Sequence, residues 1–256
     1  MWAEQVSGKK VGLSRGPGEF KADRVSLLCV HGAGGRGQEF HHLLSGLGHE
    51  FNLAAIDLPG HGNTPGPGRD RVEEYAAWME EFLRAGEVKP VLLGHSMGGA
   101  IAQTLALQSP ELLEGLILWG TGARLRVLPA LLQNLAQDFP AAVDLLASLA
   151  FAPAAPGPML EDWRRLLNQN KPSVLLGDYV ASDHFDVMAR LAEISLPTLV
   201  VGGDQDQLTP VKYAQYLHQH IPGSQMAVIP SSGHMIHLEQ PQAACAAVAD
   251  FLRNLP

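Results

Sequence analysis

Two kinds of hydrophobic pattern alternate along the chain. Short runs of consecutive apolar residues are typical of buried strands, whereas apolar residues that recur every three or four positions are typical of helices with one buried face. Because the two patterns alternate, we expect an α/β fold with a mostly parallel central sheet and helices on both of its faces. The strand-type runs cover residues 25–30, 51–58, 91–93, 113–119, 198–203 and 226–229. The helical patterns cover residues 40–47, 72–83, 96–109 and 241–255.

Two regions depart from this alternation. Residues 1–24 are polar and contain four glycines, which predicts a short antiparallel hairpin at a sheet edge. In residues 124–191 the strand-type runs disappear, and leucine and alanine dominate between six prolines, which predicts several short helices joined by kinks. We therefore expect residues 1–123 and 192–256 to form the α/β core, and residues 124–191 to form a helical cap (lid) inserted over its catalytic face.

Composition narrows the classes of protein to consider. With 256 residues, 46% of them hydrophobic, the chain can bury a large core, which excludes a disordered protein. The net charge is -8, from 18 basic and 26 acidic residues, and no basic cluster is present, so nucleic acid is not an expected partner. The chain has no run of about 18 apolar residues and no leader-like start, so we expect a cytoplasmic protein without a membrane segment. Cys29 and Cys245 are expected to be buried free thiols.

The strand-type run that ends at residue 93 leads directly into Gly94-His95-Ser96-Met97-Gly98 and then into a helical pattern. A glycine-x-serine-x-glycine segment between a strand and a helix is typical of a nucleophile elbow. The glycines remove side chains that would collide with neighbouring backbone, and the helix N-terminus faces the place where negative charge develops during acyl transfer. Ser96 is therefore the predicted nucleophile.

A second glycine-rich loop, His31-Gly32-Ala33-Gly34-Gly35, follows the strand at residues 25–30. Gly32, Gly34 and Gly37 have the spacing of a dinucleotide-binding loop, and Asp57 follows Gly37 by 20 residues, as that motif requires. However, the helical pattern begins only at or beyond Gly37, and a histidine before the first glycine is typical of a loop that lends a backbone N–H to an oxyanion hole. We favour the oxyanion loop, and a plain tight turn remains a further alternative.

Three residues with complementary chemistry each follow a different predicted strand. Ser96, Asp206 and His234 occur in this order along the chain, after the strands at residues 91–93, 198–203 and 226–229. Functional residues gather at the carboxyl ends of parallel strands, so these loops are expected to meet. The order serine, acid, histidine is that of the catalytic triad in one class of α/β hydrolases.

The chain resembles the α/β-hydrolase superfamily, in particular its small capped esterase-like members. The resemblance covers nearly the whole chain and is carried by His31-Gly32-Ala33-Gly34, Asp57-Leu58-Pro59-Gly60-His61-Gly62, Gly94-His95-Ser96-Met97-Gly98-Gly99, Gly203-Asp204-Gln205-Asp206 with Thr209-Pro210, and Gly233-His234. It implies that Ser96 attacks a carbonyl carbon, that His234 transfers the proton and that Asp206 orients the histidine. It also implies that the backbone N–H groups of Ala33 and Met97 form the oxyanion hole.

Four residues have competing interpretations. Asp204 is an alternative acid, but the family's acid lies three residues after a glycine and four before a proline, which favours Asp206. His237 is an alternative base, but the glycine directly before His234 favours that residue. We interpret His61 as a residue that hydrogen-bonds the turn around it, and His95 as a packing or hydrogen-bonding residue beside the nucleophile.

These residues predict an ester hydrolase that works through a serine acyl-enzyme on a small-molecule ester. A serine nucleophile argues against haloalkane dehalogenases and epoxide hydrolases, which use an aspartate. Carbon-carbon bond hydrolysis, a thioesterase or a lyase on the same fold remain alternatives, as does a non-catalytic small-ligand receptor. No cofactor is expected for this chemistry. No metal is expected either, because the histidines lack the spacing of paired metal ligands: His218 and His220 are two apart in a predicted helix and so point in different directions. We expect a monomer or a weak homo-oligomer. Arg124, Arg126, Arg164 and Arg165, in or beside residues 124–191, could bind an anionic substrate, but we favour ordinary solvated surface.

Overall fold

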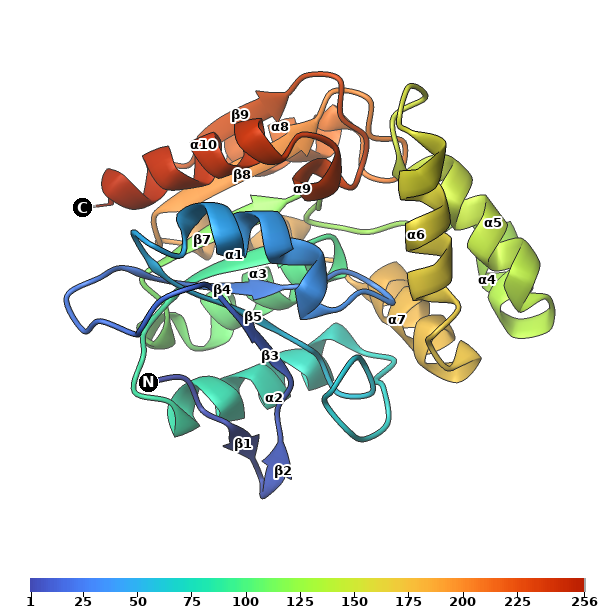
Figure 1. Cartoon of the computed structure of the whole chain (residues 1–256). Coiled ribbons are helices and arrows are strands. Elements are labelled where there is room, and N and C mark those ends of the chain that lie inside the picture. The colour runs from blue at the N-terminus through green and yellow to red at the C-terminus, as the bar shows by residue number, and fades with distance from the viewer. Residues whose placement is uncertain (256) are drawn as a thin grey trace.

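The computed structural model describes residues 1–255 and is built around one seven-stranded sheet (Figure 1). Its strand order is β3-β5-β4-β6-β7-β8-β9, and only the edge strand β3 is antiparallel to its neighbour. The strands are β3 (Leu13–Arg15), β4 (Ser26–Val30), β5 (Asn52–Ile56), β6 (Val91–His95), β7 (Gly115–Trp119), β8 (Thr198–Gly203) and β9 (Gln225–Ile229). The expected α/β fold with a mostly parallel sheet is confirmed.

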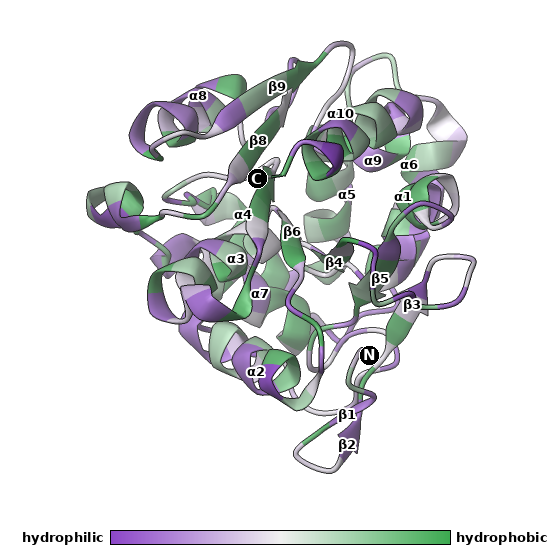
Figure 2. Ribbon diagram, turned by 90° about the vertical axis from the view of Figure 1, so that its left-hand side faces the viewer, coloured by the Kyte–Doolittle hydropathy of each residue, from purple (hydrophilic) through white to green (hydrophobic). Residues whose placement is uncertain are grey.

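The strand-type runs fall in the sheet because its interior strands are covered on both faces. Every residue of β4, β5, β6, β7 and β8 is buried, so these strands need apolar residues at consecutive positions and not at alternate ones. β9 lies at the edge and is partly exposed, and its first residue, Gln225, is polar. Figure 2 shows the central strands in hydrophobic colours, while the surrounding helices carry hydrophilic residues as well.

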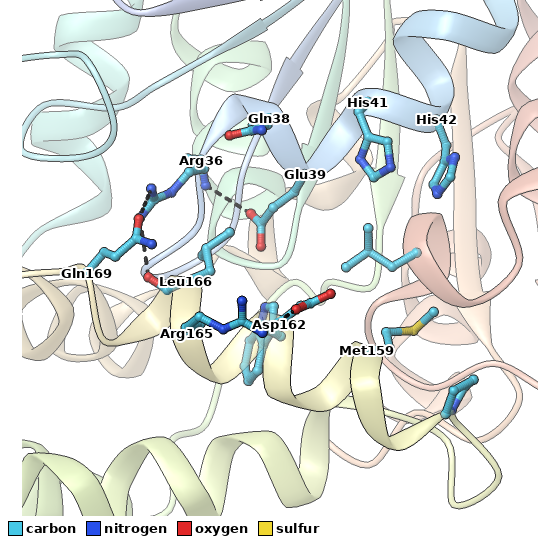
Figure 3. A pocket seen from close by; sticks show the side chains of 13 residues that line it. Arg36, Gln38, Glu39, His41, His42, Met159, Asp162, Arg165, Leu166 and Gln169 are labelled. Carbon is cyan, nitrogen blue, oxygen red and sulfur yellow. Dashed lines mark hydrogen bonds and ion pairs between the residues drawn. The ribbon is translucent and has the colours of Figure 1, made fainter.

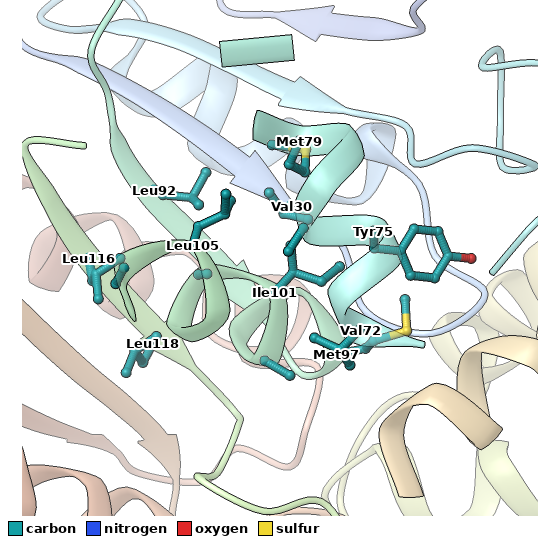
Figure 4. Packing of buried hydrophobic residues seen from close by; sticks show 14 of the residues in the cluster. Val30, Val72, Tyr75, Met79, Leu92, Met97, Ile101, Leu105, Leu116 and Leu118 are labelled. Atoms are coloured by element: carbon teal, nitrogen blue, oxygen red, sulfur yellow. The ribbon is translucent and has the colours of Figure 1, made fainter. Parts of the chain in front are cut away.

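Helices cover both faces of the sheet and divide the core into two clusters. One cluster packs α2, α3 and α8 against alternate strand residues such as Leu28 and Leu92 (Figure 4). The other packs α1 and α10 against the residues between them, such as Leu27 and Leu93. Each fully buried leucine contributes about 2 kcal/mol. The helices of this part of the chain are η1 (Gly37–Phe40), α1 (His41–Leu47), α2 (Val72–Ala85), α3 (Met97–Gln108), η2 (Pro110–Leu112), α8 (Val211–His220), α9 (Ile236–Glu239) and α10 (Pro241–Arg253).

Residues 124–191 form helices that gather at one side of the sheet, shown in yellow-green to orange-yellow in Figure 1. They share a third hydrophobic cluster, which includes Leu131, Leu146 and Trp163 and is joined by Met235 from outside this segment. Prolines occupy the first or second position of each of the four α-helices, where the missing N–H costs nothing, so the prolines start these helices and do not kink them. The elements are α4 (Pro129–Gln137), α5 (Phe139–Ala150), α6 (Gly157–Leu167), α7 (Pro172–His184) and η3 (Met188–Glu193).

The N-terminal segment differs in part from the expectation. A hairpin does form, from β1 (Gln5–Val6) and β2 (Lys9–Lys10), but it is a separate two-stranded sheet. The edge of the main sheet is instead β3, which pairs with β5. Of the two free cysteines, Cys29 is buried in the sheet, but Cys245 is only half-buried. Among the described residues, no helix is both long and apolar enough to cross a membrane.

Candidate active site

Ser96 occupies the sharp turn between β6 and α3. Its backbone has a positive φ of 54°, which a side-chain-bearing residue adopts only where the surroundings enforce it. Here the Ser96 N–H donates to the Trp119 carbonyl at 3.0 Å, and the Thr121 hydroxyl donates to the Ser96 carbonyl at 2.8 Å. A Cβ atom at Gly94 would overlap the backbone of Gly98, which explains the glycine at that position. The turn holds a half-buried serine at the carboxyl end of the central strand.

Asp206 and His234 meet at the neighbouring strand ends, after β8 and β9. The His234 Nδ1–H donates to Asp206 Oδ2 over 2.8 Å, and both side chains are buried. The backbone N–H groups of Leu208 and Thr209 donate to the other carboxylate oxygen, and the Thr209 hydroxyl donates to Oδ2, each over 2.8 Å. Burial alone would raise the pKa of Asp206, but His234 and these donors outweigh it and lower that pKa. Asp206 is thus an ionised, fully bonded partner for the imidazole.

Ser96 and His234 line two shared pockets. The larger has a volume of about 360 Å³, and its wall is largely apolar. It comes in part from residues beside and within α4, α5 and α7, and in part from the core, mainly residues 207–213. The smaller is a void of about 20 Å³ beneath the glycine loop. Among residues 1–255 the Ser96 hydroxyl has no hydrogen-bond partner. A ligand in the larger pocket would therefore meet an uncommitted hydroxyl beside an imidazole.

The glycine loop after β4 lies over this serine, with Ala33 lining both pockets. Within the described part of the chain, neither the Ala33 nor the Met97 N–H donates to a backbone or side-chain acceptor. His31 stabilises the loop from below: its Nδ1 donates to the Gly32 carbonyl at 2.7 Å and its Nε2 accepts from the Leu58 N–H at 3.0 Å. Burial, together with nearby His61, lowers the pKa of His31 well below its usual value, which keeps this ring neutral.

The structure argues against dinucleotide binding by this loop, because Asp57, the acidic residue of that motif, is already hydrogen-bonded within the protein. One Asp57 carboxylate oxygen accepts the N–H of Gly37 and the other accepts the N–H of Asn63, both over 2.8 Å. A carboxylate that is occupied by backbone donors is not available to a ribose hydroxyl. Asp57 thus stabilises the turns around it, as its position in a proline-glycine turn suggested.

The structure separates the rival residues from the Ser96 pocket. Asp204 accepts the N–H of Ser232 over 3.2 Å, and its side chain does not contact the histidine. His237 is buried and stacks on Phe40 with ring centroids 4.9 Å apart, and burial lowers its pKa to about 3. His95 donates from Nε2 to the His234 carbonyl over 3.1 Å. His95 therefore supports the loop that carries His234.

Several residues that contact this region were not singled out from the sequence. Thr209 bonds the acid, and Glu239 accepts the N–H groups of Ala152 and Gly233 over 2.8 and 3.0 Å. Asp178 of α7 bonds His61 across 117 positions of sequence. Its only local signal is an aspartate between apolar residues in the middle of the helix.

A larger surface pocket of about 670 Å³ lies between η1 and α6 (Figure 3). Glu39 points into it and accepts the Arg36 N–H with one oxygen at 2.9 Å, while its other oxygen has no partner among the described residues. Burial raises the pKa of Glu39 to about 7. Glu39 and Trp163 also line the 20 Å³ void, so these two side chains separate the surface pocket from Ser96. In residues 1–255 no three His, Cys, Asp or Glu side chains are grouped as metal ligands.

Comparisons with known proteins agree with this architecture. Residues 25–241 match the model of a family described as the alpha/beta hydrolase fold. Over 245 residues the chain is 31% identical to the pimeloyl-[acyl-carrier protein] methyl ester esterase of Yersinia enterocolitica, a match that covers 89% of this chain and 93% of the relative. The corresponding proteins of Vibrio campbellii and Neisseria meningitidis are 27% and 28% identical, over 88% and 90% of this chain and 93% and 94% of theirs.

Solved structures give the same result. A thermophilic esterase superposes with a TM-score of 0.88 at 37% identity, which covers 100% of this chain and 97% of that one. A hydrolase from Pseudomonas aeruginosa PA01 superposes with a TM-score of 0.86 at 27% identity, over 98% and 97% of the two chains. Both likenesses extend over the sheet and over residues 124–191.

Proposed function

Because this chain belongs to the alpha/beta hydrolase fold family, we propose that it is a serine hydrolase that cleaves carboxylic esters through an acyl-enzyme. The observation that supports this best is the buried Asp206–His234 pair, joined over 2.8 Å, whose histidine lines the same pocket as Ser96. The names of the similar proteins, which include several esterases, agree with ester cleavage.

In the proposed reaction, Ser96 Oγ attacks the ester carbonyl carbon while His234 Nε2 takes the hydroxyl proton. The tetrahedral intermediate then expels the alcohol, which receives that proton from His234. Water attacks the resulting acyl-enzyme with the same histidine as base, which releases the acid and restores the serine. Asp206 holds the imidazole in the tautomer that leaves Nε2 free, and its ionised carboxylate stabilises the imidazolium.

The negative charge of the intermediate needs donors, and we assign this role to the N–H groups of Ala33 and Met97. Met97 is the first residue of α3, so its N–H lies at the positive end of the helix dipole. Each such donor contributes about 3 kcal/mol to transition-state stabilisation. Because the donors belong to the main chain, the side chains at these positions have other roles: Ala33 lines the pocket, and Met97 is buried in the hydrophobic core.

We further propose that residues 124–191 act as a cap over a core of residues 1–123 and 192–256, and that the cap shapes the acyl site. The 360 Å³ pocket takes Leu131 from α4, Leu149 from α5 and Tyr179 from α7. Its polar mouth carries Arg126 and Lys212, both exposed and without a carboxylate within ion-pair distance among the described residues. This arrangement fits an ester whose acyl chain is apolar near the carbonyl and polar or anionic at its far end.

The Yersinia enterocolitica relative is named for a substrate of that kind, a methyl ester of pimelate held on acyl-carrier protein. For this chain we propose a small-molecule or carrier-linked carboxylic ester. A cytoplasmic location and a monomer or weak homo-oligomer stay predictions, as does the expectation that no nucleic acid or membrane is a partner.

Hydrolysis of p-nitrophenyl esters of increasing acyl chain length tests the proposal. The wild type should hydrolyse them, with a preference set by the pocket, and Ser96→Ala should lose at least about a thousandfold in kcat. Ser182→Ala is the matched control, because Ser182 lines the same pocket but donates its hydroxyl within α7 and should keep most activity.

The alternatives predict other outcomes. If a folded wild type cleaves no ester but hydrolyses a thioester or a carbon-carbon bond, the substrate class is wrong and the mechanism through Ser96 still holds. If Ser96→Ala hydrolyses esters as fast as the wild type, the assignment of the nucleophile is wrong. A protein that binds small ligands and turns over none of these substrates would be a receptor.

A further inference from the structure

Residues 124–191 form hydrogen bonds with the glycine loop that carries Ala33. The N–H of Gly34 donates to Asp178 Oδ2 over 2.8 Å, and the carbonyl of Gly34 accepts from Asn170 Nδ2 over 2.7 Å. Asp178 lies in α7 and Asn170 precedes it, 144 and 136 residues from Gly34. Both polar groups of one loop residue are thus bonded by the cap.

These bonds constrain the orientation of the Ala33 N–H. That N–H shares a peptide plane with the carbonyl of Gly32, which accepts the Gly35 N–H over 3.1 Å. The Gly35 N–H in turn shares a peptide plane with the carbonyl of Gly34, which Asn170 holds. The peptide unit between these two joins Ala33 to Gly34, and its N–H, that of Gly34, donates to Asp178. The cap therefore fixes the two peptide units that follow Ala33. The unit that contains the Ala33 N–H is held by the Gly35 N–H and by His31 Nδ1, which donates to the Gly32 carbonyl over 2.7 Å, so the cap acts on that N–H through the neighbouring units.

Asp178 is itself fixed by the core. It is fully buried and accepts the Tyr75 hydroxyl over 2.6 Å and His61 Nε2 over 2.8 Å. Figure 4 shows the Tyr75 hydroxyl pointing away from the apolar cluster around its ring. Burial disfavours a charged His61, but the Asp178 carboxylate outweighs this and raises the pKa of His61. A buried carboxylate with three donors is held firmly, because loss of any donor leaves part of its charge unsatisfied.

The loop has the residue type that this contact requires. Gly34 has a positive φ of 67°, and a Cβ atom there would overlap the Leu175 side chain of α7. The glycine lets α7 approach the loop closely enough for Asp178 to reach the backbone N–H.

We propose that the cap positions the oxyanion hole, with Asp178 and Asn170 as positioning residues for the Ala33 N–H. The inference rests on the proposed ester hydrolysis and goes beyond it, because it makes the docked cap a part of the catalytic geometry as well as a wall of the pocket. Neither residue touches the reacting atoms. Displacement of the whole cap would leave the oxyanion donor unaligned and would also break the bond from the His234 N–H to the Ala150 carbonyl of α5, which is 2.8 Å long. The bonds of Asp178 and Asn170 to Gly34 therefore have to be removed one at a time to test the positioning role.

The test compares two aspartates of the same helix. Asp183 also lies in α7 and also accepts a backbone N–H, that of Val127 over 3.0 Å, but it does not contact the loop. We expect Asp178→Ala to lower kcat for a p-nitrophenyl ester about tenfold to a hundredfold with little change in KM, because a misaligned donor weakens only the transition state. Asp183→Ala should keep kcat within about threefold of the wild type.

Two further variants separate positioning from loss of structure. Asp178→Asn keeps an oxygen acceptor for the Gly34 N–H and should restore most of the lost kcat. Asn170→Leu removes the other bond while it leaves Asp178, His61 and Tyr75 intact, so it tests the inference even if Asp178→Ala does not fold. Its kcat should fall, and the affinity of a trifluoromethyl ketone, which mimics the oxyanion, should fall by the same factor.

The outcomes distinguish this inference from the proposed function. If the wild type hydrolyses esters and Asn170→Leu keeps its kcat and its affinity for the ketone, the positioning role is wrong and the ester hydrolase stands. Equal losses in Asp178→Ala and Asp183→Ala would also overturn it, since they would indicate a general effect on α7. A wild type without ester turnover refutes the function itself, and the ketone affinities then still report on the loop.

Discussion

Residues 1–255 contain two buried aspartate-histidine pairs, and in each pair the imidazole and the carboxylate are 2.8 Å apart. Asp206 and His234 come from loops at neighbouring strand ends, and His234 lines the pocket around Ser96. His61 comes from the turn after β5, and its partner Asp178 comes from α7, within residues 124–191, the proposed cap. The first pair brings together loops of the core, whereas the second connects the core to the cap.

The pairs differ in whether the ring nitrogen that does not contact the aspartate has a hydrogen-bond partner within the protein. In the second pair His61 Nδ1 donates to the Pro59 carbonyl over 3.2 Å, so both nitrogens are bonded within the protein. In the first pair, by contrast, Nδ1 of His234 is bonded and the ring reaches the pocket that holds Ser96. Buried pairs of the same geometry therefore serve different purposes: an imidazole with an accessible nitrogen can transfer protons, and one with both nitrogens bonded can only stabilise.

The largest expected difference follows from the same substitution in both pairs. Asp206→Asn should lower kcat by about 10⁴-fold, because it removes the charge that stabilises the imidazolium and favours the wrong tautomer. Asp178→Asn, as argued above, should cost less than about tenfold. Steady-state kinetics on one p-nitrophenyl ester measures both, with far-ultraviolet circular dichroism as the check on folding. Similar losses in the two variants would erase the distinction between the pairs.

A smaller effect is expected from a third buried carboxyl, which has no histidine partner. Glu39 has a pKa of about 7 in the folded protein, against an ordinary value of 4.5, so the folded state binds its proton more tightly than the unfolded state does. Stability therefore falls as the pH rises from the unfolded pKa through the folded one, by up to about 3 kcal/mol. Glu39→Gln should lack this loss.

Urea unfolding of the wild type and Glu39→Gln at about pH 5 and about pH 8.5 measures the effect. The two proteins should be similar in stability at the lower pH, and the variant should be the more stable at the higher pH. Other titrating groups are common to both and cancel in the difference. A stability difference that is the same at both pH values would show that Glu39 does not titrate in this range.

The sequence predicted the core and its loops because those features are local. A strand covered on both faces requires consecutive apolar residues, and a nucleophile elbow requires glycines two positions from Ser96, so both leave patterns within a few residues. The loops that bear Asp206 and His234 could be paired because parallel strands bring their carboxyl ends to one edge. The roles of the three residues stay a proposal until they are tested by substitution.

The contacts between cap and core could not be predicted in this way. Asp178 and Asn170 reach Gly34 across more than a hundred residues, and no periodicity records such a contact. The prolines of the cap were recognised, but position within a helix decides whether a proline starts it or kinks it, and the helix boundaries were not known. The hairpin of residues 5–10 was predicted to lie at the edge of the main sheet, but it forms a sheet of its own. The two could not be told apart from the sequence because the true edge strand, β3, follows the hairpin directly.

The central claim is that one serine is activated by the Asp206–His234 pair, and labelling with a fluorophosphonate tests it most directly. Intact-mass analysis should show one adduct on the wild type, peptide mapping should place it on Ser96, and Ser96→Ala should stay unlabelled. Labelling of Asp206→Asn should be much slower. A wild type that does not react, or an adduct that persists in Ser96→Ala, would contradict the account.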